Sequence, residues 1–422
     1  MRISKAGASI ACLLCGLAGI RVAAADTGLT LAQAIDHALT RNPELRASAF
    51  RQTKAQAGMA QAQLRPAPEL ALELENFAGS GDTHDTNSLE STLSFTQILE
   101  LGDKRSARVE LAAIEIDLAA FEQRARELDI LAEVTRRFLA AASAAERLGL
   151  AKESQTLAQE TLDAVTRRVA AARSPLADES RARIAATSAR LDVQQAESMW
   201  RTRRYALAAS WGETEPQFTT VRADLFSFEA DPGFPVLMAR IARNPAFLRF
   251  ANEIRLRDAQ LRLAQIQNRP DLALTLGIRY LHQSGDAALV AGFAMPLNSR
   301  KRSDISQGAL RAELAQAQAE QEAASVLART TLFGLYEEMS SARRRAEALR
   351  AEALPLARTA LEQTQAGYDR GRFAFSELAA ARQELLTLHS AAIESATSCH
   401  ELRTEIQRLT GEPLTPIEAN QP

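Results

Sequence analysis

Leu272-Ala273-Leu274-Thr275-Leu276-Gly277-Ile278-Arg279-Tyr280 alternates large apolar residues with small or polar ones. This is the two-residue period of a β-strand with one apolar face and one polar face. Residues 70–75, 89–96 and 289–297 show the same alternation, and glycine-containing turns at 79–82 and 284–286 join the segments in pairs. The sequence therefore predicts two β-hairpins, at about 69–98 and about 271–297. Hairpins packed on a soluble core would show the same pattern.

The two hairpins belong to a pattern that recurs after about 200 residues. The matches keep their order along the chain: Arg41-Asn42-Pro43 with Arg243-Asn244-Pro245, Leu70-Ala71-Leu72 with Leu272-Ala273-Leu274, Lys104-Arg105-Ser106 with Lys301-Arg302-Ser303, and Gly212-Glu213 with Gly411-Glu412. This interval is too long for a solenoid repeat. We therefore expect two structural repeats built on one plan, residues 26–215 and residues 216–422.

Residues 1–25 have the features of a secretory signal peptide: basic Arg2 and Lys5, an apolar run from Ile10, and three alanines ending at Ala25. Its removal leaves Cys399 as the single cysteine, so we expect no internal disulfide. It also removes three basic residues, leaving 47 basic and 52 acidic side chains in the mature chain. This balance argues against nucleic acid as a partner.

Long helices are predicted on both sides of the hairpins, over about 104–211 and about 303–409, the second stretch being interrupted by Pro355. A run of apolar and small residues follows steps of four and three, which is a heptad seam: Ile114, Leu118, Phe121, Ala125, Leu128, Ala132, Thr135 and Leu139. A narrow apolar stripe with a wide polar surface favours a wall one helix thick. An ordinary coiled-coil bundle would show the same seams.

The mature chain contains no run of about 18 apolar residues, so we expect no transmembrane helix. The other structure that can span a membrane is a closed β-barrel. Four strands cannot close a barrel, and an open sheet in lipid would leave its edges unpaired. If the hairpins span a membrane, several chains must therefore combine them, and three chains would give twelve strands.

Three segments resemble the TolC-like outer-membrane efflux channels, and specifically the heavy-metal branch typified by CzcC and CusC. Residues 29–45 resemble the opening motif of that family, residues 65–70 its helix-to-strand junction, and residues 95–105 the strand exit most typical of the heavy-metal branch. Asp103 stands where this branch commonly has a second glycine. The resemblance covers essentially all of residues 29–413.

The resemblance implies a mainly α protomer with two β-hairpins, in a homotrimer with a twelve-stranded outer-membrane β-barrel and a long periplasmic α-helical barrel. It implies three kinds of partner: outer-membrane lipid, a periplasmic adaptor protein, and an inner-membrane RND pump driven by protons. It implies passive export of heavy-metal cations of the cobalt, zinc and cadmium type. No cofactor is implied.

The resemblance also indicates functional residues at the two turns between the long helices, which are expected to be the far periplasmic tips. The residues expected to dock the adaptor are Arg173, Ser174, Pro175, Leu176, Gly371, Arg372 and Phe373. Pro175 and Gly371 break the helices there, whereas the first tip lacks the glycine common in the family. Glu377 and Tyr368 are expected to form the periplasmic gate. Alternatively, Glu377 is a solvated surface residue paired with Arg382 or Arg372.

Enzyme chemistry is not indicated. None of the five histidines has a metal-ligand spacing with another, and adjacent Cys399 and His400 point about 100° apart on a helix. No paired carboxylate site, nucleophile elbow or phosphate loop is found. We therefore expect a passive channel, not an enzyme. The alternatives are an exit duct for organic toxicants or for type I protein secretion, and a periplasmic adaptor, against which the duplicated plan argues.

Overall fold

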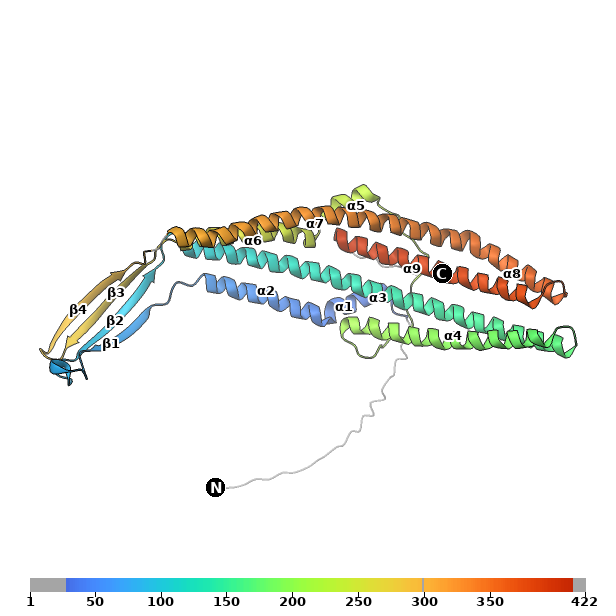
Figure 1. Cartoon of the computed structure of the whole chain (residues 1–422), viewed down its shortest axis with the longest axis horizontal. Helices are drawn as coiled ribbons and strands as arrows, with labels where there is room; N and C mark the ends of the chain where they lie inside the picture. The colour runs from blue at the N-terminus through green and yellow to red at the C-terminus, as the bar shows by residue number, and fades with distance from the viewer. Residues whose placement is uncertain (1–27, 298–299, 413–422) are drawn as a thin grey trace, which may run out of the picture.

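The computed structural model describes residues 28–297 and 300–412. The predicted signal peptide, residues 1–25, lies outside the described residues, as do residues 413–422. The molecule is elongated, with a β-sheet at one end and long helices running away from it (Figure 1). No helix in the described ranges is both long and apolar enough to cross a membrane.

One order of elements occurs twice: a helix, a hairpin, a long helix, a turn and a returning helix. The first half contains α1 (Leu31–Arg41), α2 (Pro43–Ala62), β1 (Glu69–Glu75), β2 (Glu90–Leu99), α3 (Lys104–Ala170) and α4 (Leu176–Ala208). The second half contains α5 (Phe234–Ile241), α6 (Pro245–Gln267), β3 (Leu272–Leu281), β4 (Asp286–Ala294), α7 (Arg300–Ala348), α8 (Leu354–Asp369) and α9 (Phe375–Thr410). Short 3-10 turns follow at Gly81–Thr83 and Ala209–Trp211.

A π-helical turn, Leu349–Ala353, joins α7 to α8 where the sequence predicts an interruption at Pro355. Proline has no N–H to donate to the carbonyl four residues earlier, and its ring clashes with that carbonyl. In the π turn the N–H of Leu354 bonds to the carbonyl of Leu349, five residues back. Pro355 then lies in the first turn of α8, so the long helix continues instead of ending.

The four strands form one antiparallel sheet in the order β1-β2-β3-β4. The register places Leu72, Leu93, Ile278 and Leu289 in one row across the sheet. This apolar face is open, with Leu72 66% and Leu289 88% exposed. The sheet projects beyond the helices (Figure 1), so the alternative of hairpins packed on a soluble core does not describe this chain.

The repeated Asn-Pro and Gly-Glu motifs meet where the returning helices end. The Asn42 side chain caps α2, and its Nδ2 donates to the Ser210 carbonyl at 2.7 Å. Likewise Asn244 caps α6 and donates to the Arg408 carbonyl at 2.7 Å. The following glycines, with φ of 84° at Gly212 and 70° at Gly411, turn the chain out of each returning helix.

The residues that follow β2 contact the residue before β3, so the two hairpins are linked at the base of the sheet. Lys104 is buried, and its Nζ lies 2.7 Å from Oδ1 of Asp271, the residue before β3. Gly102 and Asp103 both have positive φ, 81° and 64°. Asp103 therefore adopts the left-handed conformation for which glycine is favoured, and the tight turn is kept despite the substitution.

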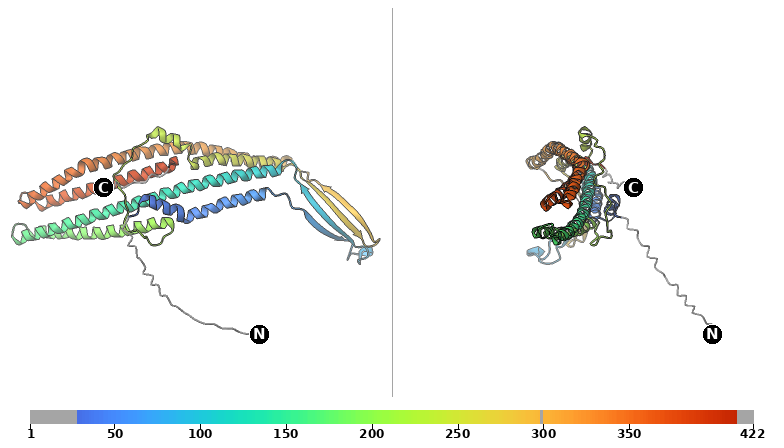
Figure 2. Two further views of the ribbon diagram at one scale, coloured as in Figure 1. Left: turned by 180° about the vertical axis from the view of Figure 1, so that it is seen from behind. Right: turned by 90° about the vertical axis from the view of Figure 1, so that its right-hand side faces the viewer.

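The helices form a curved layer when the molecule is seen end-on (Figure 2, right). Buried side chains of α1, α3 and α4 form one core cluster around Phe138, Leu207 and Trp211. A second cluster lies between α3, α7 and α9 and is covered by the segment 221–228. A third lies between α5, α7 and α9. Half of the predicted heptad seam is fully buried and the rest partly buried, with Ala132 and Leu139 0% exposed. The helices thus pack side by side, and the two tips lie opposite the sheet (Figure 1).

Candidate functional site

The predicted tip residues lie in the two turns at the end of the molecule opposite the sheet (Figures 1 and 2). The first turn joins α3 to α4, and the second joins α8 to α9. Ser174 is half-buried, and the other predicted docking residues are exposed: Arg173, Pro175, Leu176, Gly371, Arg372 and Phe373. Leu176 is 74% and Phe373 44% exposed, so each tip presents a large apolar side chain to its surroundings.

Both tips have the same backbone turn although only the second contains a glycine. In the second, Gly371 has φ +73° and its N–H bonds to the Tyr368 carbonyl at 2.9 Å. In the first, Ala172 has φ +52° and its N–H bonds to the Val169 carbonyl at 2.9 Å. Ala172 therefore takes the glycine's place in the left-handed conformation, at a cost of about 1–2 kcal/mol.

Tyr368, a predicted gate residue, is buried inside the tip of its own protomer. Its side chain is 2% exposed and belongs to a cluster with Val165, Phe375 and Leu378. Its hydroxyl has no hydrogen-bond partner among the described residues. An unsatisfied buried hydroxyl costs about 1–3 kcal/mol. The tip would therefore be stabilised if this hydroxyl acquired a hydrogen-bond partner.

Arg168 of α3 holds the two tips together. Its guanidinium carbon lies 4.6 Å from the centre of the Tyr368 ring. Nη1 donates to the carbonyls of Tyr368 at 2.8 Å and Asp369 at 3.2 Å, and Nε donates to Ser174 Oγ at 3.3 Å. The positive charge thus lies at the C-terminal end of α8, where the helix dipole favours a cation. We call this set of contacts the Arg168 clasp.

Arg382 of α9 makes a second link between the halves. Its Nη2 donates to Gln365 Oε1 at 2.9 Å, and its Nη1 donates to the Leu157 carbonyl at 3.3 Å and to Thr161 Oγ1. Burial lowers the pKa of this guanidinium, with nearby acidic groups acting against the shift. These donors are directed at α3 and α8 and not at Glu377.

Glu377, the other predicted gate residue, is exposed in the first turn of α9. Its Oε2 accepts a hydrogen bond from the N–H of Ala374 at 2.8 Å, which caps the helix. No ion pair joins it to Arg372 or Arg382 within residues 28–297 and 300–412. Asp178 has the corresponding place in the first turn of α4 and lies 3.6 Å from Arg181. The first tip therefore carries two carboxylates just after its turn, Asp178 and Glu179, and the second tip carries one, Glu377.

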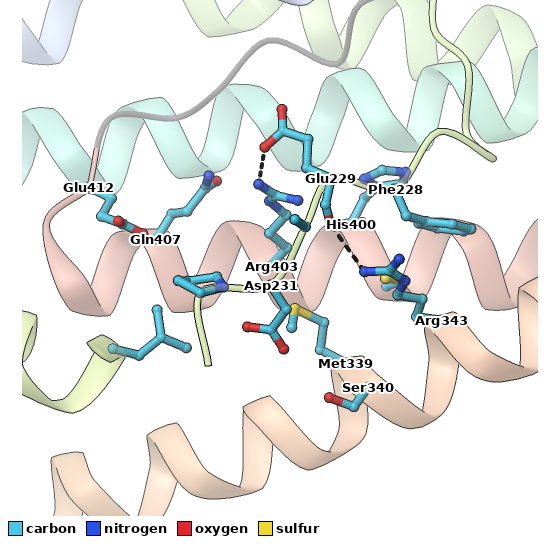
Figure 3. A pocket seen from close by; sticks show the side chains of 14 residues that line it. Phe228, Glu229, Asp231, Met339, Ser340, Arg343, His400, Arg403, Gln407 and Glu412 are labelled. Carbon is cyan, nitrogen blue, oxygen red and sulfur yellow. Dashed lines mark hydrogen bonds and ion pairs between the residues drawn. The ribbon is translucent and has the colours of Figure 1, made fainter. Parts of the chain in front are cut away.

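Cys399 and His400 line a cavity of about 60 Å³ between residues 228–232, α7 and α9 (Figure 3). The His400 ring stacks on Phe228 with centroids 5.4 Å apart, and its Nε2 lies 2.9 Å from the Leu225 carbonyl. Burial lowers the pKa of His400 and raises that of the Cys399 thiol to about 11. Both side chains are buried in this packing. No cluster of three His, Cys, Asp or Glu residues suited to a metal ion is found in the described part of the chain.

Comparison with known proteins agrees with this architecture. Residues 34–213 match the family model described as "Outer membrane efflux protein". The chain is 28% identical to the cobalt-zinc-cadmium resistance protein CzcC of Cupriavidus metallidurans, over 91% of this chain and 90% of that protein. It is 26% identical to the nickel-cobalt-cadmium resistance protein NccC of Alcaligenes xylosoxydans xylosoxydans, over 73% of this chain and 69% of that protein.

Solved structures share the fold. CusC matches with a TM-score of 0.76 and 16% identity, covering 92% of this chain and 93% of that one. The outer membrane protein VceC from Vibrio cholerae matches with a TM-score of 0.74 and 19% identity, covering 90% of this chain and 96% of that one. Both alignments cover at least 90% of each chain, so the similarity is to the fold as a whole.

Proposed function

Because the chain is a member of the TolC-like outer-membrane efflux channels of the heavy-metal type, we propose that it is the outer-membrane component of a tripartite pump–adaptor–channel system that exports divalent heavy-metal cations. The observation that carries this proposal is the match to CzcC over 91% of the chain. CzcC and NccC are named for resistance to cobalt, zinc, cadmium and nickel. We propose the same class of cargo here.

The proposed assembly is a homotrimer in the outer membrane, with the helices extending into the periplasm. Strands β1 and β4 each have one unpaired edge within the sheet of the described protomer, and such edges are very costly in lipid. Three sheets joined edge to edge would pair them all. The exposed apolar face then contacts lipid, and the polar face lines the conduit, through which cations pass without chemical change.

We propose that the tips dock the adaptor and that the carboxylates just after them form the entrance. In a trimer, Glu377 contributes three carboxylates, and Asp178 adds three from the matching position. A ring of carboxylates attracts cations. The exposed Leu176 and Phe373 are proposed to supply apolar contacts to the helical hairpins of the adaptor.

Single-channel conductance in planar bilayers tests the entrance. Glu377→Gln should reduce the preference for cations and the block by multivalent cations from the periplasmic side, with the trimer intact. Glu362→Gln, at an exposed position of α8, is the matched control and should behave like the parent. Equal selectivity in all three proteins would show that Glu377 is not at the constriction.

Growth assays on toxic metals test both the docking role of the tips and the identity of the cargo. A deletion strain should grow less well than its parent on graded cobalt, zinc, cadmium or nickel, and the intact gene should restore growth. Replacement of Leu176 and Gly371 by glutamate should abolish the rescue while trimers still form. Unchanged metal sensitivity, with new sensitivity to organic toxicants or loss of a secreted protein, would replace the proposed cargo by one of the two alternative duct functions.

A further inference from the structure

The polar face of the sheet carries one basic side chain, Arg279 of β3, among the residues of the four strands. The same face carries five carboxylates: Glu69, Glu73, Glu75, Glu90 and Asp286. Arg279 lies two residues before the end of β3, close to the hairpin turns. In the sheet it is therefore at the end away from the helices (Figure 1).

Arg279 makes hydrogen bonds to both of the preceding strands, β1 and β2. Its Nε donates to Thr92 Oγ1 at 2.9 Å, directly across from it on β2. Its Nη1 donates to Glu90 Oε2 at 2.9 Å, and its Nη2 donates to Glu75 Oε2 at 3.1 Å. Thr92 is 4% exposed and so fixes one edge of the guanidinium. A single cation thus bridges two carboxylates on neighbouring strands.

The two carboxylates would repel each other without this cation. Glu75 and Glu90 are direct partners in the β1–β2 register, and like charges directly opposite destabilise a sheet pair. Asn76 Nδ2 donates to Glu90 Oε1 at 3.0 Å, so this carboxylate is held on both of its oxygens. Two converging carboxylates with an amide nearby are also the kind of oxygen-rich set that holds a divalent cation.

We propose that Arg279 is a built-in occupant of a cation site at the outer end of the conduit, and that it keeps exported divalent cations from binding there. The inference rests on the proposed function, in which this face of the sheet lines the path. Conduction requires binding weak enough to allow release. A guanidinium fixed by three hydrogen bonds neutralises the carboxylate pair but remains part of the wall. Arg279 therefore keeps the exit free of a site that would retain the cargo.

Equilibrium dialysis of the purified full-length protein against Co²⁺ tests the inference without requiring transport. Both proteins, the parent and Arg279→Gln, are dialysed against the same Co²⁺ concentration, in the range at which weak protein sites fill. Arg279→Gln should then bind about one more Co²⁺ per chain than the parent. Arg279→Lys, which keeps the charge, and the double variant Arg279→Gln with Glu90→Gln, which removes one carboxylate, should both match the parent. In bilayers, Arg279→Gln should be blocked by Co²⁺ at concentrations at least tenfold lower than the parent.

Equal Co²⁺ binding by the parent and by Arg279→Gln would overturn the inference, as would extra binding that persists in the double variant. If Arg279→Gln fails to assemble in the presence of a chelator, added Co²⁺ should restore assembly by replacing the guanidinium, and failure to do so would also count against it. The proposed function is judged separately, by whether the parent conducts ions. A conducting parent with no new site in Arg279→Gln would reject only the inference.

Discussion

Loss of the Arg168 clasp should loosen both tips by an amount that can be worked out from its contacts. Arg168→Met keeps the aliphatic stem but removes the donors to Tyr368 and Asp369 and the stacking on the Tyr368 ring. The hydrogen bonds of this half-buried guanidinium have partly exposed acceptors and together contribute about 1.5 kcal/mol, and its stacking on the ring contributes about 0.5 kcal/mol. We therefore expect local opening of the tip to become easier by about 2 kcal/mol, or roughly 30-fold.

Hydrogen exchange measures this change directly, because the amides of Gly371 and Arg372 are bonded within the second turn and exchange only when it opens. In Arg168→Met these two amides should exchange about 30-fold faster. Arg167→Met is the matched control, since Arg167 is exposed on the same turn of α3. Unchanged exchange in Arg168→Met, or an equal increase in Arg167→Met, would refute the idea that Arg168 holds the tips together.

Three further outcomes are expected. Ala172→Gly should stabilise the protein by about 0.5–1 kcal/mol in denaturant unfolding, because glycine relieves the left-handed strain but adds chain entropy to the unfolded state; destabilisation would show that the alanine methyl packs favourably. Asn244→Ala should destabilise by about 1–2 kcal/mol in the same assay, through loss of the α6 cap and of the bond to Arg408. The folded Cys399 thiol should resist iodoacetamide at pH 8, because burial raises its pKa to about 11. That folded pKa exceeds the ordinary value of 9.0, so stability should fall as pH rises from about 9 to 11, and Cys399→Ala should abolish this part of the fall.

The helices and strands were predictable because their periodicity is strong. From Leu272 to Tyr280 the large apolar residues all lie on one face of the strand. A shift of the strand pairing by one residue would move all of them to the polar face. The predicted alternation therefore agrees with the face on which these apolar residues lie in the sheet. The break expected at Gly371 also agrees with the structure, in which α8 ends at Asp369 and α9 begins at Phe375.

The tip contacts were not predictable in the same way. Arg167 and Arg168 are adjacent and chemically identical, and only the three-dimensional position of α8, two hundred residues later, makes one of them a clasp and leaves the other exposed. Ala172 carries no sequence signal for a left-handed turn, since alanine is disfavoured there. The prediction that Tyr368 and Glu377 act at a gate came from family resemblance and stays a prediction.

The π-helical turn at Leu349–Ala353 shows how the two halves could change in length after duplication. The offset between matching residues is 197 at Lys104 and Lys301 but 199 at Ala172 and Gly371, so the arm of the second half is two residues longer than that of the first. One residue inserted into an α-helix rotates everything beyond it by about 100° and would carry Tyr368 out of its core. A π turn takes up one such residue by widening locally. The π turn can thus account for one of the two extra residues without rotating the packed end of the long arm.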